Sequence, residues 1–435
     1  MLSRMRNMFR VPDLRNKILF TLLMVFIYRV GSYLPVPYVD FNAIKALQKS
    51  AESSSGTLGY LNLFAGGALS NVAILFLGPL PYITASIIMQ LLGVVIPKIE
   101  EWQQEGQTGQ KKITQWTRYL TIALAVVQST AFVYALKSGK GGEGGLFDFG
   151  NVNPVPGFTP WRGLLIILTW TAGTAFVMWL GELITQRGIG QGISILMFAA
   201  VVSRFPASFA NIYQNSGWVP LIVVLAIGVA MITAIVFVES GQRRIPVQFA
   251  KRVVGRRMYG GQSTYIPLKV NQSGVIPVIF ASSILSFPAL LANITPESWG
   301  VTKFVNDHLT NQFSWFYIIS YTVLIIAFSY FYTAIAFNPQ QQADIIRKQG
   351  GFIPGIRPGP PTERYLARLL NRITFPGSLF LAFIAVLPLL VFKFMDIQGF
   401  PFGGTSILIA VGVMLETMKQ IDSQLMMRNY EGFLK

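Results

Sequence analysis

The sequence contains no cysteine and only one histidine, His308, among its 435 residues. Disulfide frameworks, thiolate metal sites and thiol nucleophiles are therefore excluded, and no cluster of histidines can form. Charged residues are also scarce, because they make up 12% of the chain, whereas a soluble domain carries about 25%. Hydrophobic residues account for 52%. Together these features favour a chain whose main solvent is lipid.

Ten apolar runs approach the length of roughly 20 residues that a helix needs to cross a bilayer. Unpaired backbone groups are very unfavourable in lipid, so we expect helices and not open strands. The run at 192–210 is unusual because it contains Arg204 and Pro206. The ten runs lie at approximately 17–36, 72–96, 116–137, 161–184, 192–210, 218–239, 273–292, 315–337, 373–393 and 403–420.

The distribution of lysine and arginine predicts the orientation of these spans. With ten spans both termini lie on one side, and the segments on that side hold 26 Lys and Arg, whereas the opposite loops hold 8. Cytoplasmic loops of membrane proteins carry the excess of positive charge. The sequence therefore predicts a multi-pass protein with both termini in the cytoplasm.

Two of the predicted cytoplasmic loops, 240–272 and 338–372, are long, basic and rich in glycine and proline. The stretch Gly241 to Pro267 holds six Lys or Arg and no acid. Membrane topology alone could favour such charge. A docking surface for acidic protein, anionic lipid or RNA phosphate is the functional alternative.

Small and polar residues mark two further features of the apolar part. The segment 61–71, LNLFAGGALSN, is too short to cross the membrane and forms either an interfacial loop or a fold-back between helices. Four polar residues within predicted spans either hydrogen-bond neighbouring helices or line a seam that can open. They are Gln90, Gln128, Ser282 and Ser283.

The sequence GIGQG at 188–192 is better explained as a tight turn followed by a helix from about Gly192 than as a nucleotide site, because no βαβ pattern surrounds it. Ionisable residues within the runs lie near their ends, and Glu182 is interpreted as structural. This placement disfavours a solute transporter with charges at the midplane, which stays the alternative function. No Ser–His or Ser–Lys pair can be assembled in a span, so the chain is not expected to be an enzyme.

Several long motifs, in order along the whole chain, resemble those of the SecY family, the central channel subunits of the bacterial Sec protein translocase. The motifs are LGPLPYITASIIMQLL (77–92), WLGELITQRGIGQGISILMF (179–198), the basic stretch 241–284, GGFIPGIRPG (350–359) and FGGTSILI (402–409). The resemblance implies an all-α polytopic membrane protein with ten transmembrane helices around an hourglass pore. Two inverted, pseudo-symmetric five-helix halves, 1–210 and 211–435, would meet at a hinge between helices 5 and 6.

The same resemblance implies a protein-conducting channel. Such a channel passes unfolded secretory proteins across the bacterial cytoplasmic membrane and releases signal sequences and membrane helices sideways into lipid. The implied partners are the SecE and SecG subunits, the SecA ATPase, the translating ribosome, polypeptides that bear signal sequences, and membrane lipid. No cofactor, metal or catalytic residue is implied.

Carried over by motif position, the resemblance assigns four groups of residues. The pore ring would comprise Ile83, Ile87, Ile193, Met197, Ile279 and Ile409. The plug, at about 57–71, would contain Leu61, Asn62, Leu63, Phe64, Ala65, Gly66, Gly67, Ala68 and Leu69. The lateral gate would use Gln90, Gln128, Ser282 and Ser283. Docking of SecA and the ribosome would use Arg243, Arg244, Arg256, Arg257 and Arg357.

Overall fold

Helices dominate the computed structural model, and each of the ten apolar runs overlaps at least one. The structure describes residues 11–40, 65–68, 71–138, 157–249, 252–254, 257–259, 263–292, 304–305, 308–309, 313–394 and 404–433. The longer helices are α2 (Pro12–Gly31), α5 (Leu80–Val95), α6 (Pro97–Gln104), α7 (Gln107–Ser138), α8 (Pro160–Arg187), α9 (Gly192–Val202), α10 (Phe205–Ser216), α11 (Trp218–Ser240), α12 (Ile276–Ala292), α14 (Trp315–Ala336), α15 (Pro339–Lys348), α16 (Pro360–Phe394) and α17 (Gly404–Phe433).

Several helices have the length and composition of membrane spans. Within the described ranges, five helical stretches are long and apolar enough to cross a bilayer, and there are six if the bent pair α5–α6 counts as one span. The five are Pro160–Arg187, Gly192–Gln214, Trp218–Ser240, Trp315–Lys348 and Pro360–Phe394. The chain is thus a helical membrane protein, and the count of ten crossings stays a prediction.

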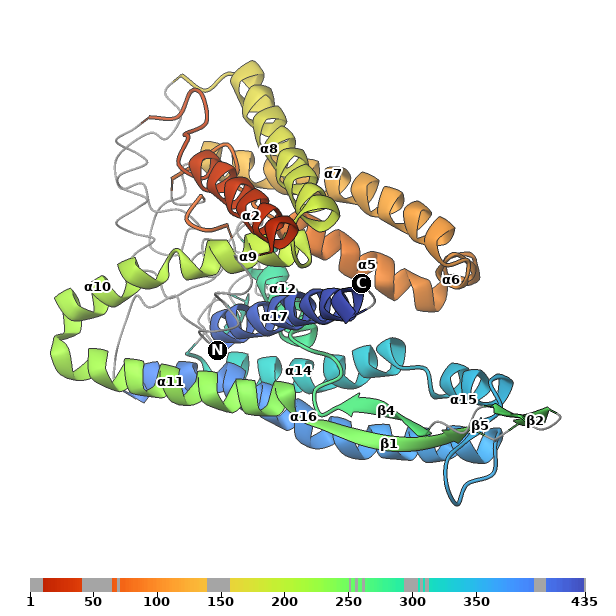
Figure 1. The fold of residues 1–435 in the computed structure, drawn as a ribbon. Helices are drawn as coiled ribbons and strands as arrows, with labels where there is room; N and C mark the ends of the chain where they lie inside the picture. The colour runs from red at the N-terminus through yellow and green to blue at the C-terminus, as the bar shows by residue number, and fades with distance from the viewer. Residues whose placement is uncertain are drawn as a thin grey trace.

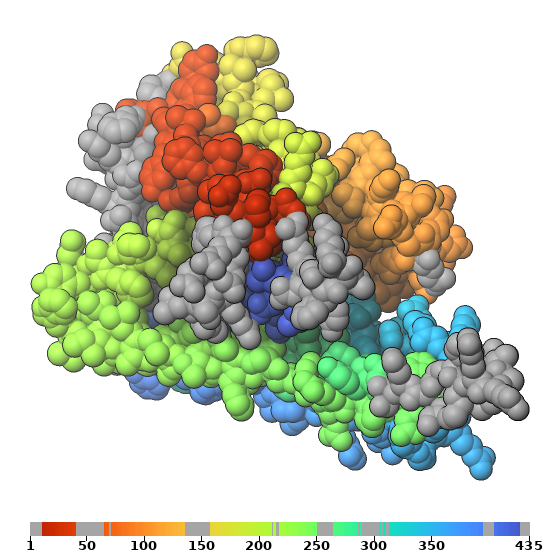
Figure 2. Space-filling model, in the orientation of Figure 1, coloured from red at the N-terminus to blue at the C-terminus, as the bar shows by residue number. Residues whose placement is uncertain are grey.

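The helices form two groups that follow chain order (Figure 1). Helices α2 and α5 to α9 make the first group, and α11 to α17 make the second. The chain reverses direction between α10 and α11 at Gly217, which has a φ of 83°; glycine adopts this conformation without steric cost. Helix α9 packs against α17, which joins the groups, and Figure 2 shows α17 between α2 and α11.

Each group has its own apolar core, so each packs as a body. The first group fully buries Tyr28, Leu180 and Leu196. It also buries Phe76 and Trp170, whose stacked ring centroids lie 4.1 Å apart. The second group buries a larger cluster that runs through α11, α12, α14, α16 and α17. The inverted relation between halves 1–210 and 211–435 stays a prediction.

The first basic loop folds into a small sheet beside α15 and the start of α16, and the second basic loop joins it through one short strand (Figure 1). Strands β1 (Gln242–Phe249) and β4 (Ser263–Lys269) pair antiparallel, with Ile245 opposite Ile266. Strand β5 (Gly351–Phe352), from the second loop, pairs with the other edge of β1. Strands β2 (Arg252–Val254) and β3 (Arg257–Tyr259) form a separate short ladder.

In two predicted runs the observed helix begins late or is divided, and proline explains both. The run 72–96 begins with turns, and α5 starts only at Leu80, beside Pro79 and Pro81. The run 192–210 is divided into α9 and α10 at Ser203 and Arg204, just before Pro206. A proline fits the first turn of a helix but disrupts its interior, so it starts a new helix at both places.

Candidate functional site

An apolar cluster lies where the two helix groups meet. Its buried members are Met197 of α9 and Ile409 of α17, which are 4% and 1% exposed. Five partly buried residues pack against them: Leu80 and Ile83 of α5, Val275 and Ile279 at the start of α12, and Val413 of α17. Both groups therefore contribute to one cluster whose side chains are all hydrocarbon or thioether.

Four of the six residues predicted for the pore ring meet in this cluster, namely Ile83, Met197, Ile279 and Ile409. Ile87 is buried one turn further along α5. Ile193 is buried against α8, where its Cδ1 would lie 2.3 Å from a Cβ added at Gly181. The ring role of all six stays a prediction, and the structure favours the first four.

Sequence reasoning missed Leu80, Val275 and Val413 in the cluster. Each lies three or four residues from a predicted ring member, at the spacing that places two side chains on one face of a helix. That spacing is the signal that could have identified them.

Close helix packing positions α9 and α17, the two helices that carry the buried members of the cluster. At Gly192, the first residue of α9, a Cβ would lie 1.8 Å from the carbonyl oxygen of Gly181. At Gly404, the first residue of α17, a Cβ would lie 1.9 Å from the carbonyl oxygen of Ile384. Only glycine allows these two backbones to approach α8 and α16 so closely.

The turn Ala65–Ala68, from the predicted plug, is buried against α9. Ala65 and Ala68 are fully buried, and Gly66 and Gly67 both have positive φ, 65° and 90°. A Cβ at Gly66 would lie 3.0 Å from Cβ of Ala200, one turn beyond Met197. The rest of the predicted plug, Leu61 to Phe64 and Leu69, lies outside the described residues.

The predicted gate residues occupy three helices. Gln90 lies on α5, and its buried Oε1 has no hydrogen-bond partner in the described part of the chain. Gln128 lies on α7 and is partly buried. On α12, Ser282 donates to the Ile279 carbonyl at 2.9 Å, and Ser283 is partly buried beside it.

Three of the five predicted docking residues lie on the small sheet or in the turn before α16. Arg243 and Arg244 are exposed on β1, and the Arg244 guanidinium lies 4.8 Å from the Tyr265 ring centroid. Arg357 is exposed in the turn before α16, and its carbonyl accepts a bond from Thr362 Oγ1 at 2.9 Å. Arg256 lies outside the described residues, and Arg257 begins β3.

One core holds these docking elements together as a single body. Ile245, Val247 and Leu268 of the sheet pack with Ile346 of α15 and Leu366 of α16. Sequence reasoning placed the two basic loops on one face but did not foresee that β5 would join them into one sheet.

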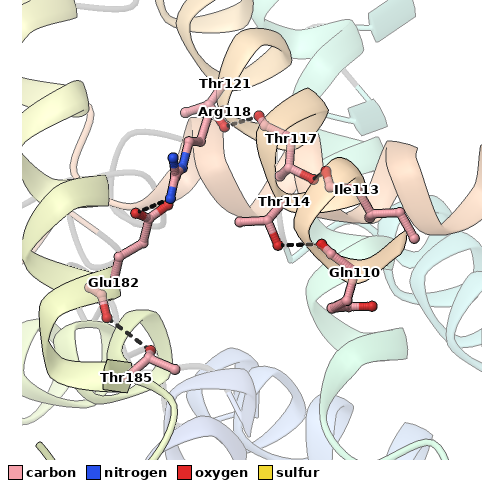
Figure 3. A network of polar contacts seen from close by, with 9 residues as sticks. Gln110, Ile113, Thr114, Thr117, Arg118, Thr121, Glu182 and Thr185 are labelled. Atoms are coloured by element: carbon pink, nitrogen blue, oxygen red, sulfur yellow. Dashed lines mark hydrogen bonds and ion pairs between the residues drawn. The ribbon is translucent and has the colours of Figure 1, made fainter. Parts of the chain in front are cut away.

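An ion pair that sequence reasoning also missed fastens α7 to α8 (Figure 3). Arg118 Nε lies 2.6 Å from Glu182 Oε1, and Arg118 Nη2 lies 2.6 Å from Oε2. The forked geometry matches the two carboxylate oxygens. It agrees with the structural interpretation of Glu182. No group of three His, Asp or Glu that could hold a metal occurs among the residues the structure describes.

Comparison with known proteins gives consistent matches over the whole chain. The SecY family model matches residues 73–418. The protein translocase subunit SecY of Streptomyces scabiei is 52% identical over 443 residues, covering 100% of both chains. The same subunit from Mycobacterium tuberculosis (strain ATCC 25618 / H37Rv) is 51% identical over 448 residues, again with 100% coverage of both.

Two solved structures share the fold at lower identity. A protein-conducting channel matches with a TM-score of 0.62 and 19% identity, covering 94% of this chain and 91% of the other. Sec61 in the canine ribosome-channel complex matches with a TM-score of 0.58 and 18% identity, with the same coverage. The family model and the full-length relatives together show that this chain belongs to the SecY family.

Proposed function

We propose that this chain forms the protein-conducting passage of a translocase: unfolded secretory proteins cross the membrane through it, and signal sequences and membrane helices leave it sideways into lipid. The apolar cluster that both helix groups build carries this proposal, and we take it as the constriction of the passage. A narrow apolar ring excludes water and ions. It also offers a moving polypeptide no hydrogen bond that would hold it.

The buried turn Ala65–Ala68 supports a second seal. It packs against α9 one turn beyond Met197, so an outward movement of this turn would widen the path at the constriction. We assign the segment 57–71 as the plug on this basis.

The sideways exit would run between α5 and α7 on one side and α12 on the other. An amide oxygen that is buried without a partner raises the free energy of the closed state. Gln90 Oε1 has no hydrogen-bond partner among the described residues, and this supports a seam that opens at low cost.

The basic sheet would receive the driving partner in the cytoplasm. Three exposed arginines suit carboxylate or phosphate partners, because a guanidinium can bind either group through two parallel hydrogen bonds. They are Arg243, Arg244 and Arg357. We assign SecA and the translating ribosome to this face, and SecE and SecG as companion subunits. The chain would lie in the bacterial cytoplasmic membrane with both termini inside, and it would hydrolyse no ATP itself.

A secondary solute transporter is the rival function. Such proteins place charges or helix ends around a midplane substrate, whereas the side chains of the constriction are uncharged and apolar. The arrangement therefore favours passage of a flexible chain over recognition of a small solute.

Protection of a precursor from protease tests the proposal. Proteoliposomes would contain this chain with SecE and SecG, and SecA with ATP would be added outside. We expect ATP-dependent protection that needs a signal sequence. Folded and inserted chain that gives no protection, while the vesicles accumulate a small solute, would favour the transporter.

A further inference from the structure

Two neighbouring residues of α2 bond to adjacent carbonyls of the buried turn. Arg29 Nη1 donates to the Gly66 carbonyl at 2.8 Å, and Tyr28 Oη donates to the Ala65 carbonyl at 3.5 Å. We propose that Arg29 is the latch of the resting channel: its guanidinium holds the turn Ala65–Ala68 against α9, and opening requires this bond to break. The inference rests on the proposed function, since it takes the turn as part of the seal.

The small side chains of the turn make the Arg29 bond important for holding it in place. Alanine and glycine bury little apolar area, so the hydrophobic effect fixes a turn of Ala65, Gly66, Gly67 and Ala68 only weakly. The turn is nevertheless fully buried at both alanines. Polar contacts must therefore fix much of its position. Backbone bonds from Asn71 N to the Gly67 carbonyl (3.2 Å) and from Ala73 N to the Ala68 carbonyl (2.9 Å) tie the turn to its own chain, and Arg29 ties it to α2.

The bond from Arg29 is the stronger of the two side-chain contacts that α2 makes with the turn. A hydrogen bond from a charged donor is shorter and roughly twice as strong as a neutral one, and the Tyr28 contact is already at the limit of bonding distance. Within the described part of the chain, Arg29 forms no ion pair with a carboxylate. The charged group of Arg29 instead bonds to the Gly66 carbonyl of the turn.

The guanidinium is also held in place for this task. Its Nη2 donates to Tyr33 Oη at 3.1 Å, and its carbon lies 5.2 Å from the centroid of the Tyr33 ring, one turn further along the chain. A donor that is already oriented loses little side-chain entropy when the turn docks. The contact can thus close again each time a polypeptide leaves.

The backbone of the turn makes the fit exacting. Two consecutive residues with positive φ, Gly66 and Gly67, aim the Gly66 carbonyl at α2. On the α9 side, Ala200 Cβ lies 3.0 Å from a Cβ added at Gly66, and Arg204 Nη1 lies 3.1 Å from one added at Gly67. The turn therefore lies in close contact with both α2 and the end of α9, which leaves its backbone little room to shift.

Ion conductance of the resting channel in planar bilayers gives the first test. We expect Arg29→Leu to raise it about tenfold, which corresponds to about 1.4 kcal/mol of lost closed-state stability. Arg29→Lys keeps a charged donor and should give a smaller rise. The matched control is Arg15→Leu, which removes an exposed arginine from the other end of α2 and should leave conductance unchanged. Equal conductance in Arg29→Leu and the parent would overturn the latch.

Cysteine labelling gives a second test that does not depend on transport. The chain has no cysteine, so Ala68→Cys places a single thiol in the buried turn. A membrane-impermeant maleimide added outside should label it about tenfold faster when Arg29→Leu is also present, and at the parental rate when Arg15→Leu is present. Labelling at the same rate with and without Arg29→Leu would contradict the proposal.

The two tests separate the latch from the proposed function. A parent complex that fails to protect any precursor would contradict the channel, yet the labelling rates would still decide whether Arg29 holds the turn. If Arg29→Leu fails to fold, the labelling rate of Arg29→Lys is compared with that of Gly66→Ala, in which a side chain strains the turn at φ 65°. Slower labelling in Arg29→Lys supports the latch. An equal or higher rate overturns it.

Discussion

The docking sheet and the apolar constriction are held together in opposite ways. The sheet is fixed by a continuous backbone register from Gln242–Lys269 to Gln248–Ser263, and a third strand locks the second basic loop to it. The constriction is held only by dispersion contacts among aliphatic and thioether side chains from both helix groups. The sheet has a unique geometry set by many polar contacts, whereas the side chains that meet in the constriction are apolar and form no hydrogen bonds with one another.

This difference fits the work that each region would do. A surface that receives a partner benefits from arginines held at fixed positions, because less entropy is lost on binding. A seal that must open for many sequences and close again benefits from contacts that any side chain can replace. We expect changes in the sheet to affect transport without leak, and changes in the constriction to cause leak with docking intact.

Reversing one charge at the docking face should have the largest effect. We expect Arg357→Glu to reduce SecA-driven precursor transport about 100-fold, because a repulsive charge replaces a forked donor in the exposed turn before α16. Precursor protection measures the loss, and resting conductance should stay at the parental value.

Arg364→Glu is the matched control for this prediction. It makes the same change of charge at an exposed position on the first turns of α16. A similar loss in both variants would mean that total charge matters and that the position of Arg357 does not.

A polar residue in the constriction should cause leak. Ile83→Asn places an amide in the cluster, attracts water and should raise resting conductance about tenfold. Ile193→Asn tests the boundary of the ring, because Ile193 packs on α8. It should lower stability by about 1–3 kcal/mol through a buried polar group and leave conductance unchanged. Conductance in planar bilayers that rises equally in both variants would show that the ring extends beyond the observed cluster.

The two regions also differ in how far the sequence could predict them. The helices followed from run lengths, and the start of α9 at Gly192 followed from the glycine-rich turn. The sheet could not be foreseen, since its pairing of Gln248 with Phe352 joins residues far apart in the chain. The constriction residues came from family resemblance, because an isoleucine that lines a seal has the same local pattern as one that faces lipid.

A smaller effect is expected at the ion pair within the first helix group. Arg118→Leu leaves Glu182, whose side chain is 18% exposed, without its cation. Removing one partner of a buried pair costs about 3–5 kcal/mol, and an exposed pair contributes about 0–1 kcal/mol. Arg118 is 43% exposed, so we expect a loss of about 1–2 kcal/mol in the free energy of unfolding.

Urea unfolding in detergent measures that loss. The double variant Arg118→Leu with Glu182→Leu should regain most of the stability, because no unpaired charge remains. Conductance should not change in either, since the pair lies within one helix group; a leak in Arg118→Leu would connect the α7–α8 contact to the seal.

The smallest effect is expected where the seam already carries an unsatisfied group. Gln90→Leu replaces the buried, unpartnered Oε1 by hydrocarbon of similar volume and should stabilise the closed seam by about 1 kcal/mol. Opening then becomes less frequent, so transport of a precursor with a weak signal sequence should slow about fivefold. Gln115→Leu, the same change at an exposed position of α7, should have no effect. Faster transport in Gln90→Leu would mean that the amide hydrogen-bonds to a partner in the closed state. A polar contact would then hold the seam closed, as the Arg29 bond holds the buried turn.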